Sequence, residues 1–348
     1  MNAATRAAVG TPAAGAPAGS RAGGHPVPQG ESRTDAFRAM GSEVTLTVVG
    51  PGPVAGDALA AARAAVEQVE AACTRFRPSP LTAANADPDA WHAVPAALAT
   101  AVLEARRSYE ATRGAFDPRV LDVLLAWGHD EALAGGPAAV PAPVWPAALL
   151  PSGVRLPAVD RPWQPRVRRR SDGWWLHLDG QPIDLGGIGK GLAVRAAAEA
   201  LRGAGRGALV DAGGDIVVLG DGPAGDWRVG VEDPAGGDAP VLVLSLRDTA
   251  CATSSVHRHS WLAGDRPVHH LVDPRTRRPG GDGLAAVTVL GSDPAWAEVW
   301  SKSLFLAGAA HVRGRAEDAG LPAAWVRRDG AVGMTESFAE HVTWRNDD

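Results

Sequence analysis

A glycine-rich segment with one lysine is the first place where this sequence could do chemistry. It reads Asp184-Leu-Gly-Gly-Ile-Gly-Lys190-Gly and precedes a stretch with helical spacing that runs to Leu201. Glycines before a helix let backbone N–H groups approach an anionic oxygen, and the helix start adds partial positive charge. Lys190 adds a mobile cation of the kind that binds phosphate. The spacing is not that of a Walker A loop, so the segment alone predicts either an anion site or a structural turn.

Histidines gather in a second segment, His257-Arg-His259 followed by His269-His270 and Asp273. Such a group would suit zinc, but His269 and His270 are neighbours in a strand predicted over 268–272. Their side chains then point to opposite faces and cannot both bind one metal. We therefore expect one histidine in a site and one on the surface. A histidine near Asp273 suits a general base, because the ordinary pKa of imidazole lies near neutral pH.

Two shorter segments are ambiguous when taken alone. Gly114-Ala-Phe-Asp117-Pro is typical of a turn that ends a helix, and Gly213-Gly214-Asp215 is typical of a tight turn between strands. The sequence has no G-x-S-x-G motif, which leaves a serine hydrolase without support.

The elements that must position these residues follow from hydrophobic periodicity. Val44, Leu46 and Val48 alternate with polar residues and predict a strand. Helices are predicted over 57–76, with Asp57 as the N-cap, over 95–113, from the glycine-rich segment to Leu201, and over 294–308. Further strands are predicted over 174–178, 208–211, 216–219, 227–231, 241–246, 268–272, 284–290 and 323–327. This mixed order with many antiparallel signals predicts an α+β fold.

Composition excludes several classes of protein. The chain has 348 residues, 45% hydrophobic and 21% charged, with a formal net charge of −5. This balance is that of a globular protein, and it argues against a non-specific nucleic-acid binder. No uninterrupted apolar run is long enough for a membrane span. Cys73 and Cys251 are the only cysteines, which excludes a disulfide scaffold and a four-cysteine zinc site.

The first 33 residues differ from the rest of the chain. They are rich in Ala, Gly and Pro, so we expect a disordered tail over 1–33 and one folded domain over 34–345. Residues 131–165 are also rich in Ala and Pro and are predicted to run over the surface. The N-terminal segment has neither the apolar core of a signal peptide nor an early cysteine for lipidation, and we expect a cytoplasmic location.

In their order along the chain, these segments resemble the ApbE family of flavin transferases (FAD:protein FMN transferases). The resemblance runs from about Phe37 to Gly308. The matching segments are Met40-Gly41-Ser42, Arg75-Phe76-Arg77-Pro78 with Ser79 and Asn85, Gly114-Ala-Phe-Asp117-Pro, Trp127-Gly128, the glycine-rich segment from Asp184, Ala212-Gly-Gly-Asp215 with Trp227-Arg-Val-Gly, Thr253-Ser254, His270-Leu-Val-Asp273-Pro-Arg-Thr276 and Leu304-Phe-Leu-Ala-Gly308.

The resemblance implies an α+β fold with mixed, largely antiparallel sheets and packed helices that binds FAD as substrate. Members of the family transfer FMN from FAD to a Ser or Thr hydroxyl of an acceptor protein and release AMP, and some hydrolyse FAD instead. The attack of a hydroxyl on a phosphorus of the pyrophosphate needs a base, cations that neutralise phosphate charge, and fixed geometry.

By position, the resemblance also implies roles for individual residues. The glycine-rich segment would become a phosphate cradle, and His270 would be the base that deprotonates the acceptor. Met40 and Phe76 would contact the flavin or adenine, Leu271 would line the site, and the nucleotide would be held by Ala115, Phe116, Asp117, Asp184 and Lys190.

The magnesium site of the family is altered here. Family members bind Mg²⁺ through a backbone carbonyl of the glycine-rich turn, at Gly187 in this sequence, and through an Asp and a Thr four residues apart. Those two positions hold Glu298 and Lys302. Glutamate can bind Mg²⁺, whereas the lysine ammonium has donors only. Ser301 could offer an oxygen, but from a different side of the helix.

Two interpretations stay open at this point. Lys302 could place a fixed positive charge where the metal would lie, pairing with Glu298 at i, i+4. Alternatively, the site has lost its activity and the protein binds flavin, or nothing, in a non-catalytic role. An FAD-hydrolysing homologue and a partner-binding protein built on this fold are further alternatives. Arg119, Ser255 and Arg277 also stand where the family has a Thr, a Gly and a Gly. Because the nucleotide-binding segments persist, we expect a flavin transferase with an acceptor protein as its partner.

Overall fold

An eight-stranded antiparallel sheet forms the centre of the computed structural model, which describes residues 5–7, 31–129, 161–257, 260–263 and 266–346. Its strand order is β18-β17-β16-β11-β8-β7-β3-β2. In chain order the bounds are β2 Ser32–Ala39, β3 Ser42–Val49, β7 Gly207–Ala212, β8 Asp215–Gly220, β11 Thr249–Ser255, β16 Leu284–Gly291, β17 Ala323–Arg327 and β18 Val332–Met334. In the middle of the sheet, β8 pairs with β11 over only Ile216–Val218 and Thr249–Cys251.

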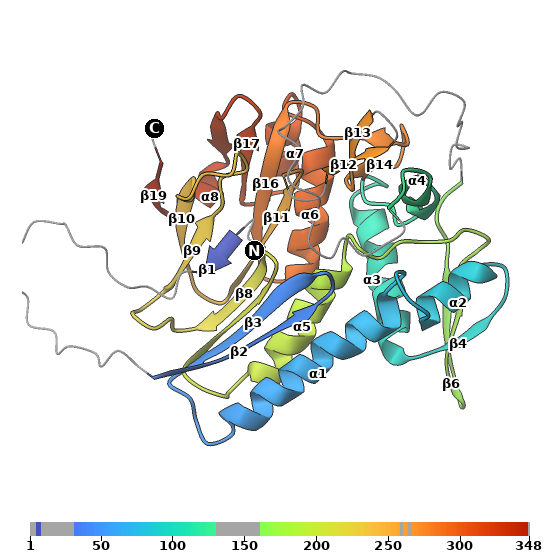
Figure 1. Cartoon of the computed structure of the whole chain (residues 1–348), viewed down its shortest axis with the longest axis horizontal. Helices are drawn as coiled ribbons and strands as arrows, with labels where there is room; N and C mark the ends of the chain where they lie inside the picture. The colour runs from blue at the N-terminus through green and yellow to red at the C-terminus, as the bar shows by residue number, and fades with distance from the viewer. Residues whose placement is uncertain (1–4, 8–30, 130–160, 258–259, 264–265, 347–348) are drawn as a thin grey trace, which may run out of the picture.

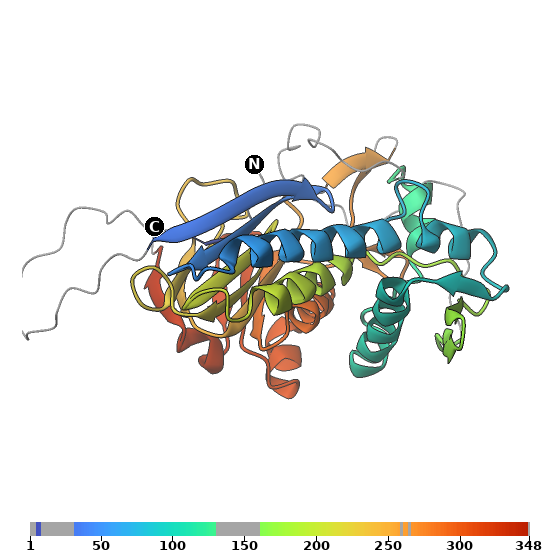
Figure 2. The ribbon, with the colours of Figure 1, turned by 90° about the horizontal axis from the view of Figure 1, so that it is seen from below.

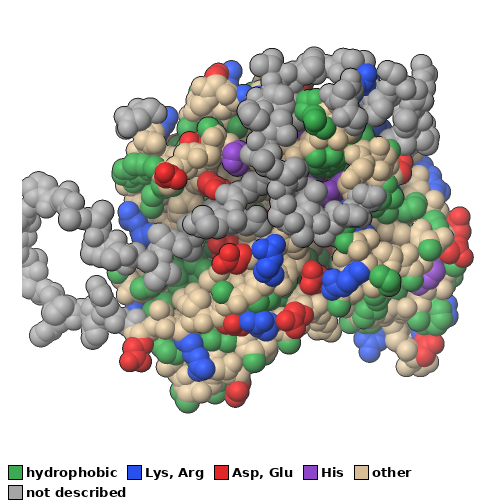
Figure 3. All heavy atoms as spheres, in the orientation of Figure 1, with side chains coloured by type: hydrophobic (Ala, Val, Ile, Leu, Met, Phe, Trp, Pro, Cys, Tyr) green, Lys and Arg blue, Asp and Glu red, His purple; other side chains and the backbone are tan. Residues whose placement is uncertain are grey.

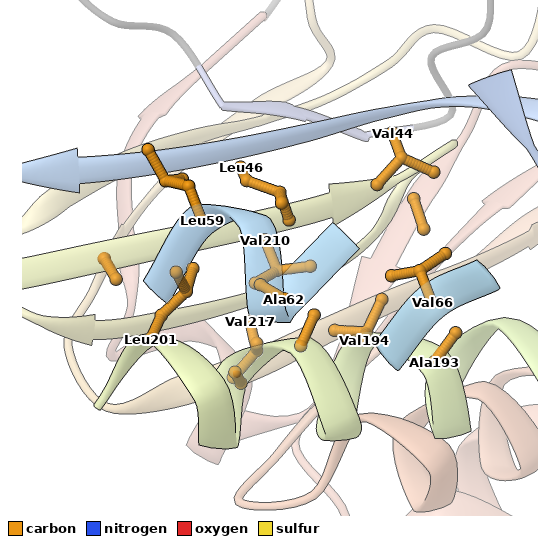
Figure 4. Packing of buried hydrophobic residues seen from close by; sticks show 14 of the residues in the cluster. Val44, Leu46, Leu59, Ala62, Val66, Ala193, Val194, Leu201, Val210 and Val217 are labelled. Carbon is orange, nitrogen blue, oxygen red and sulfur yellow. The ribbon is translucent and has the colours of Figure 1, made fainter. Parts of the chain in front are cut away.

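Three helices cover one face of this sheet: α1 (Ala55–Cys73), α5 (Gly189–Leu201) and α6 (Pro294–Leu306) (Figures 1 and 2). Strand residues Val44 and Leu46 point toward α1 and α5 in the close-up (Figure 4). Both are fully buried. The alternation predicted for this strand therefore places its apolar side chains against the helices, where removal from water stabilises the layer contact.

A second, four-stranded sheet covers the other face. Its order is β1-β9-β10-β19, with bounds Thr5–Ala7, Trp227–Val231, Leu242–Leu246 and Val342–Arg345. Ile216 and Val218 pack with this sheet, whereas Val217 between them packs with the helices. This period of two along β8 is why a single apolar strand can serve two cores.

A smaller region of helices and short strands adjoins the helical layer, and α1 extends to it (Figure 2). It contains α2 (Pro80–Ala86), α3 (Ala96–Ala111), α4 (Leu121–Ala126) and the sheet of β4 (His92–Val94), β6 (Gly173–His177) and β5 (Arg166–Arg170). The other short elements are β12 (Ser260–Ala263), β13 (Arg266–His269), β14 (Val272–Asp273), β15 (Arg278–Pro279), α7 (Val312–Asp318) and α8 (Glu336–Ala339).

The α+β fold expected from the sequence is confirmed, but several elements differ from those predicted. The first long helix begins at Ala55 after Val54, so Asp57 lies in its first turn instead of capping it. The strand predicted over 268–272 is wrong, because β13 ends at His269 and β14 begins only at Val272. Strand β11 was not predicted, because its small residues Thr-Ala-Cys-Ala-Thr-Ser-Ser show no alternation of large apolar side chains.

The predicted tail over 1–33 lies largely outside the described residues, as do residues 130–160 of the predicted surface segment. Within the tail segment the structure places β1 against β9 and starts β2 at Ser32. In the described ranges, no helix combines the length and apolarity needed to cross a membrane. Basic and acidic side chains are interspersed over the visible face of the molecule (Figure 3).

Candidate active site

A cavity of about 430 Å³ lies beside the glycine-rich turn, where α1, α5 and α6 meet the smaller region. It is lined by most of the residues that the sequence analysis selected: Met40, Phe76, Ala115, Phe116, Asp117, Asp184, Gly187, Lys190, His270, Glu298 and Lys302. A cavity of this size is in the usual range for a small-molecule site. The segments are far apart in the chain, and the fold brings them to one place.

The glycine-rich turn is held by Asp184. Its carboxylate accepts from the backbone N–H of Gly186 at 2.8 Å and pairs with Arg75 Nε at 2.5 Å. The Arg75 guanidinium lies over the Phe76 ring, 4.2 Å from its centre. Asp184 therefore fixes the turn and orients Arg75, a residue to which sequence reasoning gave no role.

Gly191 sets the contact between the two helices of the site. A Cβ at this position would lie 2.5 Å from the Ala295 Cα and 2.6 Å from the Pro294 carbonyl oxygen. Only glycine allows α5 to approach the start of α6 this closely. The Gly191 N–H also donates to Glu298 Oε2 at 2.7 Å, so Glu298 ties α6 to α5.

Lys190 lies in the first turn of α5 between two buried carboxylates. Its ammonium pairs with Asp215 at the start of β8 and lies 3.8 Å from Glu298 Oε1. Burial alone would lower the pKa of Lys190, but Asp215 and Glu298 outweigh it and the pKa is raised. Burial, aided by Asp215, raises the pKa of Glu298 to about 7 against the opposing effect of Lys190. Sequence analysis gave Asp215 no role, although a carboxylate opening a buried apolar strand signals an ion pair.

Lys302 lies one turn after Glu298 in α6, and its side chain extends to the glycine-rich turn. A Cβ on Gly187 would lie 2.5 Å from the Lys302 Nζ, so the ammonium abuts the backbone of the glycine-rich turn. Among the described residues Lys302 forms neither a hydrogen bond nor an ion pair, and the pairing with Glu298 expected from the i, i+4 spacing is wrong. Glu298 instead accepts from Gly191. Burial lowers the pKa of Lys302 against the opposing effect of Glu298. Lys190 acts in the same direction as burial, and Asp184 and Asp215 act with Glu298.

Two predicted site residues, both in the described part of the chain, do not line the cavity. Leu271 is fully buried in a core cluster with Phe305, because the chain turns inward after His270. Ser301 is 1% exposed, and its hydroxyl contacts the Ser254 hydroxyl and the Glu298 carbonyl oxygen, both at 2.9 Å. The side chain of Ser301 therefore faces β11.

The two neighbouring histidines point to different surroundings, although His270 lies outside the strand, and only one goes where we expected. His270 lines the cavity. His269 is buried instead of lying on the surface, with its Nδ1 accepting from the Leu271 N–H and its ring edge-to-face with Phe305. Burial, together with Arg328, lowers the pKa of His269 to about 3, so it is neutral at physiological pH. His257 also lines the cavity, whereas His259 lies outside the described residues.

An arginine network borders the cavity near Asp117. Arg119 is 4% exposed and pairs with Asp117 at 2.7 Å. Arg277 donates to the Arg119 carbonyl oxygen at 3.0 Å and pairs with Asp122. Arg277 has φ +58°, the left-handed region that favours glycine. Arg277 thus adopts a backbone conformation that glycine adopts more readily, and both arginines hold the chain around the site.

Comparison with known proteins identifies the class. The α+β fold is shared with the ApbE protein of Thermotoga maritima (TM-score 0.71, 24% identity, 89% of this chain and 99% of that one). It is also shared with the flavinyl transferase ApbE of Pseudomonas stutzeri (TM-score 0.69, 21% identity, 91% and 100%). A sequence profile of the ApbE family matches residues 40–325. The chain belongs to the ApbE family.

Curated relatives carry a more specific name. This chain is 30% identical over 281 residues to the FAD:protein FMN transferase of Rhodobacter capsulatus, which covers 79% of this chain and 51% of that protein. It is 26% identical over 239 residues to the FAD:protein FMN transferase of Salmonella typhimurium, covering 67% and 66%. The chain spans about half the length of the first of these relatives.

Proposed function

We propose that this protein transfers FMN from FAD to a Ser or Thr hydroxyl of an acceptor protein and releases AMP. The observation that carries the proposal is the Lys302 ammonium, which projects to the backbone of the glycine-rich turn without an ion-pair partner among the described residues. A cation in that position suits the pyrophosphate of FAD. The names of the curated relatives support the same activity.

The lining of the cavity divides into an apolar and a charged part. Met40, Phe76 and Phe116 offer surfaces for the flavin or adenine rings. The start of α5 and Lys302 offer positive charge for the phosphates. In this proposal FAD binds with its pyrophosphate at the glycine-rich turn.

The reaction would proceed by attack of the acceptor hydroxyl oxygen on the phosphorus that carries the FMN part. The new O–P bond forms, the bond from that phosphorus to the bridging oxygen breaks, and AMP leaves with that oxygen. His270 would take the hydroxyl proton, since it is the histidine of the 269–270 pair that lines the cavity. Lys302 would neutralise part of the charge that develops on the leaving phosphate.

Magnesium, which the family resemblance implies, does not fit the residues present. The Lys302 ammonium lies against Gly187, and the Ser301 hydroxyl faces Ser254. In the described ranges, no group of three or more His, Cys, Asp or Glu side chains could hold a metal ion. We therefore assign no step to Mg²⁺.

The test is incubation of the protein with FAD and two different acceptor domains that carry a Thr site. Mass spectrometry should detect FMN on the acceptor and AMP in solution, and His270→Gln should abolish both. AMP without adduct on either acceptor would indicate FAD hydrolysis. Bound FAD that is never cleaved would indicate a non-catalytic flavin-binding protein.

A further inference from the structure

The cations of the cavity differ in whether a carboxylate faces them. Four Lys or Arg side chains line it: Arg75, Arg77, Lys190 and Lys302. Arg75 pairs with Asp184, Arg77 lies 3.7 Å from Glu70, and Lys190 lies between Asp215 and Glu298. Lys302 forms no ion pair among the described residues, and Glu298, Asp184 and Asp215 act on its charge only from longer range. Its charge is therefore available to an anion that enters the cavity.

The amino-acid usage of the chain singles out the same positions. Of its 34 Lys and Arg residues, only Lys190 and Lys302 are lysines, and both line this cavity. Elsewhere the chain uses arginine for every basic side chain. A lysine ammonium is a compact point charge with three rotatable donors, whereas guanidinium is a broad planar fork. At both positions the chain therefore has the more compact of the two cations, which suits the narrow space beside the glycine-rich turn.

The position of Lys302 also excludes a divalent ion from the same space. The Nζ lies within contact distance of Gly187, whose carbonyl would be a metal ligand by the family resemblance. Mg²⁺ needs well-placed oxygen ligands at about 2.0–2.1 Å. The ammonium supplies no acceptor and repels a second cation at that distance.

We propose that the Lys302 ammonium is the resident counter-cation of this site, binding the pyrophosphate of FAD in place of a divalent metal. The inference rests on the proposed function and deepens it. Lys302 donates hydrogen bonds to non-bridging phosphate oxygens and partly neutralises the AMP phosphate as it leaves. The bonds formed and broken are those given above, and no metal takes part in them.

An alternative is that Lys302 only offsets the negative charge that Asp215 and Glu298 have in excess of the positive charge of Lys190. In that case its ammonium should turn toward Glu298, which lies one helical turn away. Its Nζ lies against Gly187 and forms no ion pair with Glu298, although Glu298 attracts it from longer range. A structural role also predicts a loss of fold stability when Lys302 is replaced, whereas the counter-cation role predicts a loss of FAD affinity.

The first test is FAD binding without divalent ions. Equilibrium dialysis in EDTA should give the same affinity for the wild-type protein as in Mg²⁺. Lys302→Met should weaken binding in EDTA by about ten- to hundredfold, as expected for loss of a charge-assisted hydrogen bond. The matched control is Arg313→Met, which removes one positive charge from an exposed i, i+4 pair on α7 and should leave the affinity unchanged. Equal affinity of Lys302→Met and wild type in EDTA would overturn the inference.

The second test uses the fact that the chain has only two lysines. With ¹³C-labelled lysine, NMR should show two side-chain signals, assigned by Lys302→Met. FAD should shift the Lys302 signal, and millimolar Mg²⁺ alone should shift neither. A Mg²⁺-induced shift, or an unmoved Lys302 signal in the FAD complex, would contradict the proposal.

The third test separates this inference from the proposed function. Wild-type transfer should continue in EDTA, and Lys302→Thr should lose it there and regain it with Mg²⁺. Transfer that requires Mg²⁺ in the wild type would refute the counter-cation role while leaving the transferase function intact. Lys302-dependent binding of FAD with no transfer to any acceptor would support the counter-cation role and refute the transferase function.

Discussion

Two clusters of charged side chains border the cavity, and they are built differently. The arginine network (Asp117, Arg119, Asp122 and Arg277) matches each cation with a carboxylate and adds backbone carbonyl partners. The lysine cluster (Lys190, Asp215, Glu298 and Lys302) pairs only Lys190, and Lys302 faces the glycine-rich turn. Paired charges therefore fix the chain around the cavity, whereas the Lys302 ammonium, with no ion pair in the described ranges, is the group that we propose binds a ligand.

The largest loss of stability is expected when the arginine network is broken. Arg119→Met leaves Asp117 buried without its cation and removes the bonds to Gln181 and the Arg161 carbonyl oxygen. Loss of one partner of a buried pair costs about 3–5 kcal/mol. Urea unfolding should show this loss of stability. Arg202→Met, at an exposed pair with Glu199, should change stability by about 0.5 kcal/mol or less. A comparably small change for Arg119→Met would mean that the network is not structural.

A somewhat smaller loss of stability is expected at Gly191, where α5 approaches the start of α6. Gly191→Ala places its Cβ against the backbone of α6, and overpacking of this kind costs about 1–3 kcal/mol. Gly187→Ala is the matched control, because its Cβ meets mainly the movable end of Lys302. It should leave unfolding nearly unchanged but weaken FAD binding. If the two variants unfold alike, the close contact at Gly191 is unimportant.

His269, which is buried and neutral, should make the stability of the protein depend on pH. The pKa of His269 is lowered to about 3 by burial, from an ordinary value near 6.5. Between these values the unfolded chain binds a proton that the folded chain does not, so its contribution to stability is full above pH 6.5 and declines as pH falls. From pH 7.5 to pH 5 the loss is about 2 kcal/mol. His269→Asn should flatten this dependence in urea unfolding. An unchanged slope would show that other groups cause it.

The smallest effect on stability is expected at Lys302. Burial of the Lys302 ammonium opposes its attraction to Glu298, Asp184 and Asp215, so Lys302→Met should change the free energy of unfolding by about 0.5 kcal/mol or less. Urea unfolding of Lys302→Met and Arg119→Met under the same conditions compares how much each cluster contributes to the stability of the fold. A loss above about 2 kcal/mol would make Lys302 a structural cation like Arg119.

The sequence predicted those parts of the site that depend on local pattern. Strand β3 and the glycine-rich turn before α5 follow from periodicity and glycine spacing, whereas the choice of His270 over His269 came from the family resemblance. The Asp215–Lys190 pair and the close approach at Gly191 could not be predicted, because they depend on elements that meet only in the folded sheet. The i, i+4 rule failed for Glu298 and Lys302, since tertiary partners outcompete a weak helical pair.

The pairing of β3 with β7 has a consequence for how the protein folds. It joins Val44–Val49 to Gly207–Ala212, whereas every other pair of neighbouring strands in this sheet lies much closer along the chain. Because a long loop must close first, we expect β3 to join β7 late in folding. Met40 and Ser42, beside the turn between β2 and β3, line the cavity together with Asp215 and Thr253–Ser255. The binding site is therefore completed late in folding, and amide hydrogen exchange should report the β2–β3 hairpin and the other strands of the sheet as separate cooperative units.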